Sequence, residues 1–221
     1  MCYIENMGSP KKSGFTLVEI LVAATVLSLA LVVGYRVFVS FSRSFQKGSW
    51  SLTAQNKLRN ALTFIREEMQ KATPLSEVTM GGATVTTDGY EFNLTPADEL
   101  TGNGEIANWH ICLPFVVGNA DSPGAVFKCE LKLENGTILY TKTMQPGGSD
   151  PNNNEQTYNN RKVVEDVASI AISLAAFDND IPDSGSLITL IVQVEHPDKV
   201  NYESAHVTAE TAAKVEVKVV R

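Results

Sequence analysis

The stretch that decides the fold reads Gly14–Phe15–Thr16–Leu17–Val18–Glu19, and a long apolar run follows it. Glu19 is an acidic residue inside what is otherwise an apolar segment. A carboxylate placed in the hydrocarbon of a membrane costs about 2.5–3.5 kcal/mol on insertion scales, so it persists where another interaction offsets that cost. Glu19 is therefore a candidate functional residue.

The apolar run has the length of a membrane span. A helix from Phe15 to Tyr35, at about 1.5 Å per residue, covers roughly 30 Å, which is the thickness of a bilayer core. Its interruptions are Glu19, Thr25, Ser28 and Gly34. Lys11 and Lys12 precede the span and place its N-terminal side in the cytoplasm by the positive-inside tendency. The sequence thus predicts a single-pass membrane protein with its N-terminus in the cytoplasm and its C-terminal domain on the opposite side of the membrane.

The segment from Gly14 to Glu19 resembles the cleavage and methylation signature of type IV pilins and type II secretion pseudopilins. The resemblance implies that a prepilin peptidase cuts after Gly14 and that the new N-terminal residue, Phe15, is N-methylated. It also implies an assembly charge pair, in which Glu19 receives the terminal amine of a neighbouring subunit. The expected partners are other pilin or pseudopilin subunits, the peptidase and an inner-membrane assembly platform.

Three other interpretations of the N-terminus compete with this one. A secretory signal peptide would be cut after its apolar run, but Val37–Phe38–Val39–Ser40–Phe41 is a poor site for that cut. A plain signal anchor explains the span but neither Gly14 nor Glu19. A buried core helix of a soluble protein fits the length of the run least well.

The chain divides by pattern into four segments. Residues 1–14 are the leader, although Met7 is an alternative start, and Cys2 falls outside the mature protein in either case. Residues 15–39 form the membrane and assembly half of a long helix, and residues 40–73 form its amphipathic half. Residues 74–221 form an exported β-rich domain.

Apolar residues at helical spacing predict the amphipathic half, and we expect one helix from Phe15 to about Ala72. The stripe comprises Leu58, Leu62, Ile65 and Met69, extended upstream by Leu52 and Gln55. Glu67 and Lys71 have the spacing of a favourable ion pair. Pro74 ends the helix, and Gly48–Ser49 is its weak point.

The remainder predicts an α+β, pilin-like fold in which the helix packs on an antiparallel sheet. Asp88–Gly89 predicts a hairpin, and Asn135–Gly136 predicts a stronger one. The hairpin arms are residues 83–87 with 90–94 and residues 126–134 with 137–143. Further strands are expected at 109–117, 187–195 and 212–220, with a short helix and then a strand within 163–177 and a surface loop at 144–160.

Cys112 and Cys129 form a disulfide candidate, because an exported domain with two cysteines favours a bond. If the stretch between Val117 and Gly124 closes a symmetric hairpin, Cys112 faces Cys129 across the strands. The alternative is two buried free thiols.

Composition argues against several functions. The formal net charge is −7, and losing two lysines and one glutamate with the leader makes it −8, which disfavours nucleic acid as a partner. No enzyme motif is present, and neither an enzyme nor a cofactor is predicted. Weak calcium candidates, Asp178, Asp180 and Asp183, fit a solvated turn better. His110, His196 and His206 lack metal-ligand spacing.

Residues 60–72 and the hairpin from Phe127 to Thr143 resemble parts of larger minor subunits, namely the J-type minor pseudopilin and the W-type minor pilin. Thr141 departs from that pattern, which often has an arginine there. The resemblance implies a minor, tip-located subunit of a type II secretion pseudopilus. A minor type IV pilin for adhesion, motility or DNA uptake and a non-polymerising membrane-anchored binding domain remain alternatives.

Overall fold

The structure is a computed structural model that describes residues 14–73, 77–80, 83–86, 92–95, 97–113, 125–145, 155–176, 186–202, 205–215 and 219–220. It contains one long helix within these ranges, α1 (Leu17–Gln70). The helix therefore begins two residues later and ends two residues earlier than expected, and it continues through Gly48 and Ser49. The chain divides at this point into two compact units, Met1–Gly48 and Ser49–Arg221.

In the first unit, the apolar side chains of α1 lie exposed. No described residue up to Gly48 is buried, and the exposed fractions of Leu21 and Leu31 are 57% and 65%. The helix is long and apolar enough to cross a membrane. Apolar side chains that cover no core require a lipid or protein environment, which fits a membrane-anchored, pilin-like segment.

The second unit adds the strands to the end of α1. Their bounds are β1 (Glu77–Met80), β2 (Ala83–Thr86), β3 (Phe92–Leu94), β4 (Ala97–Leu100), β5 (Gly104–Cys112), β6 (Val126–Glu134), β7 (Thr137–Met144), β8 (Tyr158–Val164), β9 (Val167–Ala176), β10 (Ser186–Glu195), β11 (His206–Val215) and β12 (Val219–Val220). They form sheets of order β1-β2, β11-β10-β9-β4 and β12-β3-β5-β6-β7-β8.

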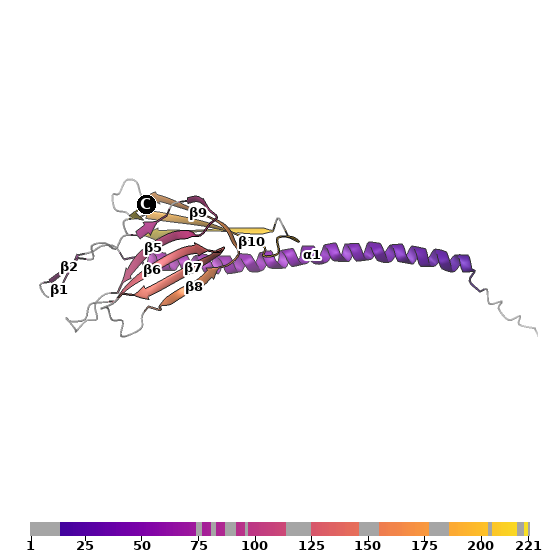
Figure 1. Cartoon of the computed structure of the whole chain (residues 1–221), viewed down its shortest axis with the longest axis horizontal. Helices are drawn as coiled ribbons and strands as arrows, with labels where there is room; N and C mark the ends of the chain where they lie inside the picture. Colours follow the sequence, from indigo (N-terminus) through magenta and orange to yellow (C-terminus); the bar gives the residue numbers. More distant parts are fainter. Residues whose placement is uncertain are drawn as a thin grey trace, which may run out of the picture. The chain divides into compact units, whose positions relative to one another are not determined.

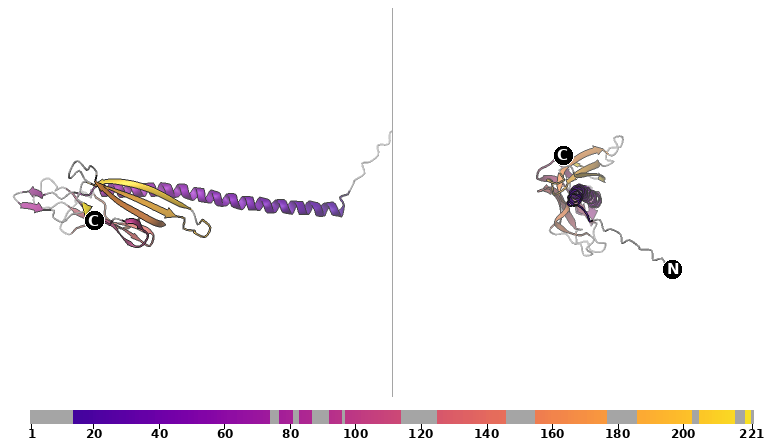
Figure 2. Two further views of the ribbon diagram at one scale, coloured as in Figure 1. Left: turned by 90° about the horizontal axis from the view of Figure 1, so that it is seen from above. Right: turned by 90° about the vertical axis from the view of Figure 1, so that its right-hand side faces the viewer.

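The two larger sheets and the end of α1 share one core. Figure 1 and the left view of Figure 2 show their strands gathered beside the C-terminal part of the helix. All the described pairings are antiparallel except that of β12 with β3. The structure therefore confirms the α+β class, with the long helix packed on antiparallel sheet.

The buried face of α1 follows the predicted stripe only from its middle onward. Its buried residues are Leu58, Ala61, Leu62, Ile65, Glu68 and Met69. Leu52 and Gln55 are exposed, and Trp50 and Ala54 pack against the core in their place. Because α-helical neighbours on one face are three or four residues apart, Trp50, Ala54 and Leu58 continue the face better than Leu52 does.

The hairpin of β6 and β7 is confirmed, with Glu134 opposite Thr137. Asn135 and Gly136 connect the strands with φ values of 51° and 71°. Two positive φ angles define a type I′ turn, whose twist matches that of the strands, and asparagine followed by glycine is its preferred sequence. The predicted strand at 187–195 is likewise confirmed as β10.

Three predictions of local structure were wrong in part. β2 pairs with β1, and β3 pairs with β5 and β12, so residues 83–87 and 90–94 do not form a hairpin. Residues 163–177 contain no helix where the structure describes them, because β8 ends at Val164 and β9 begins at Val167. The strand expected at 109–117 is β5, which begins at Gly104 and ends at Cys112. Short apolar runs fit a helix or a strand equally well, and only their neighbours decide between the two.

The predicted register of the cysteines was also wrong. Cys112 lies opposite Val126, and Cys129 lies opposite Trp109. Trp109 and Cys112 are three residues apart, so their side chains, and hence those of the two cysteines, point to opposite faces of the sheet. Both cysteines are free thiols in the structure. The assumed symmetric closure between Val117 and Gly124 lies outside the described residues, and it set the register three positions away from the real one.

Candidate functional site

The N-terminal motif lies at the start of α1, where the chain becomes helical. Gly14, Phe15 and Thr16 precede the helix without regular structure and are exposed. The exposed fraction of Phe15 is 84%, and no atom lies within 4 Å of a Cβ placed on Gly14. The bond between Gly14 and Phe15 is therefore accessible to a peptidase in the isolated subunit.

Glu19 completes a capping box with Thr16. The Thr16 amide and hydroxyl donate to Glu19 Oε2 at 2.8 Å and 3.0 Å, and the Glu19 amide donates to Thr16 Oγ1 at 3.3 Å. The first amides of a helix have no partner within it, and a threonine with a glutamate three residues later supplies one reciprocally. Glu19 thus caps the first turn of α1, and its spacing of three residues from Thr16 already allows this.

A second acidic residue of α1 lies in the core of the second unit. The exposed fraction of Glu68 is 5% and that of Lys142, on β7, is 0%. Glu68 Oε2 accepts from Tyr140 at 2.6 Å and from Lys142 at 3.1 Å, while Oε1 accepts from Lys71 at 2.7 Å. Glu155 binds both lysines. We call these residues, Glu68, Lys71, Tyr140, Lys142 and Glu155, the buried charge cluster.

The charges of the cluster balance, with two carboxylates and two ammonium groups. Burial alone would raise the pKa of Glu68, but hydrogen bonds from Lys71, Tyr140 and Lys142 outweigh it and lower that pKa. The pKa of Lys71 is raised by its contacts with Glu68 and Glu155, against the effect of burial. Buried ions are tolerated when they are paired and fully hydrogen-bonded. The cluster therefore fixes α1 on β7 at one position.

The end of α1 is held by the sheet as well. Trp109 on β5 donates its indole N–H to the carbonyl of Glu68 at 3.1 Å. That carbonyl lies in the last turn of the helix, where acceptors lack helical partners. Beyond the helix, the Thr73 amide donates to the His110 carbonyl at 3.0 Å. The predicted pair of Glu67 with Lys71 does not form, because Lys71 bonds Glu68 and Glu155 instead.

The other predicted site residues are not gathered into one site. Burial raises the pKa of the Cys129 thiol to about 12, and it raises that of Cys112, so neither is a reactive thiolate. Asp178, Asp180 and Asp183 lie outside the described residues. His110, His196 and His206 lie on β5, after β10 and on β11, and the described residues contain no cluster of metal-ligating side chains.

Sequence reasoning missed the buried charge cluster. One signal was available, because Glu68 follows Ile65 by three residues and so continues the buried face of α1. Its partners Tyr140 and Lys142 are distant in sequence, and no local pattern connects them to the helix.

The comparison with protein families matches residues 9–35 to the model described as the prokaryotic N-terminal methylation motif. The matched segment contains Gly14, Phe15 and Glu19, together with the apolar run up to Tyr35. No curated protein and no solved structure matches the chain. The chain therefore carries a type IV pilin-like prepilin signal, with the implied processing by a peptidase and assembly with other pilin subunits.

Proposed function

We propose that the protein is a structural subunit of a type II secretion pseudopilus, in the role of a minor, tip-located pseudopilin. The observation that carries this proposal is the order of Gly14, Phe15 and Glu19 at the start of an exposed apolar helix, within a segment that matches the methylation motif. Cleavage after Gly14 creates the terminal amine that a filament needs. The role is structural, and no catalysis is assigned to the chain.

Assembly in this proposal depends on two charges that are poorly solvated when alone. A terminal amine on Phe15 of one subunit and the carboxylate of Glu19 on another attract strongly in an apolar helical bundle. Pairing them selects one axial position between neighbouring helices, while apolar side chains such as Leu21 and Leu31 supply packing. The membrane holds the subunit before assembly, with its N-terminus in the cytoplasm and its β-rich unit on the periplasmic side.

The choice of a minor subunit follows from the second unit. Its strands run from Glu77 to Val220. A β-rich unit of this size is bulky for a subunit that repeats along a filament shaft, and it suits a position at the filament tip. A minor type IV pilin remains the second candidate. Gene neighbours distinguish the two, since a secretion ATPase with several short pseudopilins supports secretion and a retraction ATPase supports a pilus.

Processing is tested by Gly14→Val, with Gly34→Val in the span as the matched control. We expect uncut precursor for Gly14→Val and normal processing for the control, read as a shift on a denaturing gel. Full processing of Gly14→Val would contradict the assigned cleavage site and would leave a plain membrane anchor as the better interpretation.

Assembly is tested by comparing Glu19→Gln with Glu19→Ala. Glutamine at this position retains the capping box but has no charge, so the pair separates the two tasks of Glu19. We expect both variants to be inserted and cleaved, and both to lose at least tenfold in filament incorporation. Normal incorporation of Glu19→Gln would show that capping alone explains the residue.

A further inference from the structure

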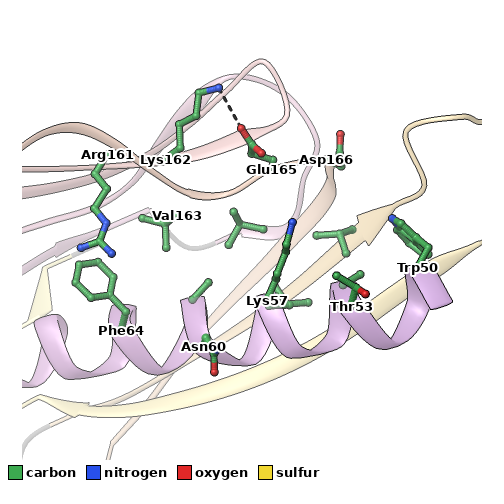
Figure 3. A pocket seen from close by; sticks show the side chains of 15 residues that line it. Trp50, Thr53, Lys57, Asn60, Phe64, Arg161, Lys162, Val163, Glu165 and Asp166 are labelled. Atoms are coloured by element: carbon green, nitrogen blue, oxygen red, sulfur yellow. Dashed lines mark hydrogen bonds and ion pairs between the residues drawn. The ribbon is translucent and has the colours of Figure 1, made fainter.

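A groove in the second unit lies between α1 and the end of β8, at the junction of the two larger sheets. Its volume is about 490 Å³, and helix residues from Trp50 to Phe64 form one wall. The facing wall is made of residues 161–166, which end β8 and lead into β9. Figure 3 shows Lys57 extending from the helix toward this wall and Arg161 lying over the ring of Phe64.

The wall from β8 presents a strand edge. β8 is the last strand of its sheet and pairs only with β7 among the described residues. Successive side chains of a strand point to opposite faces of the sheet. A groove that contacts four consecutive residues of β8 therefore lies along the edge of the strand and not over one face of the sheet. An edge strand has backbone groups available to another strand. Four residues of β8, at about 3.3 Å each, offer roughly 13 Å for such pairing.

The groove combines an apolar floor with charged sides, on which three cations, Lys57, Arg161 and Lys162, face two carboxylates, Glu165 and Asp166. Leu58, Ala61, Val164 and Val194 line its floor. The Arg161 guanidinium lies 4.4 Å from the centre of the Phe64 ring, and neither Arg161 nor Lys57 forms an ion pair within the described part of the chain. Lys162, the third cation of the lining, forms an ion pair with Glu165, and with Asp166 included the lining has three positive and two negative groups, a net charge of +1.

This small excess of positive charge contrasts with the acidic balance of the whole chain. Between Glu19 and Glu67 the sequence contains basic residues and no acidic one, although the net charge of the chain is −7. Unpaired cations beside a strand edge favour carboxylates on an incoming chain, and the apolar floor favours alternate apolar side chains. The required ligand is an extended segment that alternates apolar and acidic residues.

From the strand edge, the cations and the floor, we infer that this groove binds an extended acidic segment of a neighbouring filament subunit, added as a strand to β8. The identity of the occupant rests on the proposed function, because a filament subunit meets other subunits at close range. Carboxylates of the segment contact Lys57 and Arg161, and its apolar side chains pack on Leu58 and Val194.

The direct test measures peptide binding by fluorescence anisotropy, with the full chain in detergent micelles. The probe is a labelled, blocked hexapeptide, Thr-Val-Glu-Val-Asp-Thr, and its comparison peptide has glutamine and asparagine in place of the acids. We expect the neutral peptide to bind at least tenfold more weakly. A copy of the acidic peptide with methylated backbone nitrogens has no N–H groups to pair with β8. We expect it to lose binding if the peptide binds as an added strand. Equal binding of the acidic and neutral peptides, or undiminished binding of the methylated one, overturns the proposal.

Charge reversal at the groove provides the matched variants. We expect the single variant Lys57→Glu and the double variant with Arg161→Glu to bind the acidic peptide at least tenfold more weakly. Both should bind a peptide with lysines in place of the acids more tightly than the unmodified protein does. Arg59→Glu is the control, since Arg59 is exposed on the same helix but does not line the groove. An equal loss of affinity in Arg59→Glu would show that the peptide is attracted to the positive charge of the helix as a whole, and it would overturn the proposed site. Lys57 is exposed, so Lys57→Glu keeps the test valid if the double variant fails to fold.

The source of the segment is tested in cells with a photo-crosslinking residue at Thr53, which lines the groove and is exposed. Mass spectrometry of the adduct should identify a chain that carries the same N-terminal methylation motif. An adduct only with chains that lack the motif, or no adduct, contradicts the assignment. Cleavage at Gly14 is measured separately in Lys57→Glu and should be normal, so failure of this inference is distinguishable from failure of the proposed function.

Discussion

Glu19 and Glu68 lie on the same helix, yet their surroundings are opposite. Glu19 is exposed and is bonded by Thr16, three residues away. Glu68 is buried and is bonded by Tyr140 and Lys142, more than seventy residues away. One carboxylate is bonded by a near neighbour and remains exposed, while the other is bonded by distant residues of its own unit. The same helix thus carries a prepilin-type signal near its start and anchors a β-rich unit near its end.

The largest expected effect comes from removing the main partner of Glu68. Lys142→Met leaves the buried Glu68 and the partly buried Glu155 with the exposed Lys71 as their one ammonium partner in the cluster, and breaking a buried pair in this way costs about 3–5 kcal/mol. Urea unfolding of the second unit, followed by tryptophan fluorescence, measures the loss. Adding Glu68→Leu should recover part of it, because Glu155, which keeps its ion pair with Lys71, is then the one carboxylate of the cluster beside the methionine. A loss of unfolding free energy below about 1 kcal/mol in Lys142→Met would contradict this expectation, because it would mean that water solvates the Glu68 carboxylate.

A smaller effect is expected for Tyr140→Phe, which removes one donor to Glu68 and keeps the ring. Hydrogen bonds to charged groups contribute about 1.5–3 kcal/mol, and the stacking of this ring with Trp109 at 5.9 Å should persist. The same urea experiment measures the change. Tyr158→Phe is the control, since its hydroxyl bonds the exposed Gln156 and its loss should cost little.

Thr16→Ala tests the local side of the comparison. Loss of an N-cap threonine costs about 1 kcal/mol of helix stability, and the change should be confined to the first turn of α1. Amide hydrogen exchange in detergent micelles should quicken near Glu19, with the urea midpoint of the second unit unchanged. Slower unfolding or faster exchange in the β-strands would contradict this separation.

Mild acid should produce the smallest effect. The pKa of Glu68 is lowered in the folded protein, so the stabilisation it contributes is present above its unfolded pKa, about 4.3, and is lost as pH falls through the folded value. Between pH 7 and 5 the urea midpoint should therefore change little on account of this residue, with a steeper fall below pH 4. Glu68→Gln should lack that steeper component.

Local patterns predicted the parts of the fold that local chemistry decides. Asn135 and Gly136 are the preferred residues of a type I′ turn, and β6 and β7 paired as expected. The prediction that Cys112 lies opposite Cys129 was wrong. It depended on the geometry of the connection between their two strands, which no local sequence pattern dictates. The short helix expected at the start of residues 163–177 was also wrong, while the strand expected after it is β9, because apolar content does not choose between helix and strand without tertiary partners.

The sequence by itself determined the prepilin-type signal and the membrane-length run. Each of these depends on residues a few positions apart, whose geometry the helix or the extended chain already sets. Only the tertiary structure decided that Glu68 is bonded by Tyr140 and Lys142, that the cysteines face opposite ways and that β8 forms an open edge beside Lys57. These features join segments distant in the chain, and their positions follow from packing the whole core rather than from any local preference.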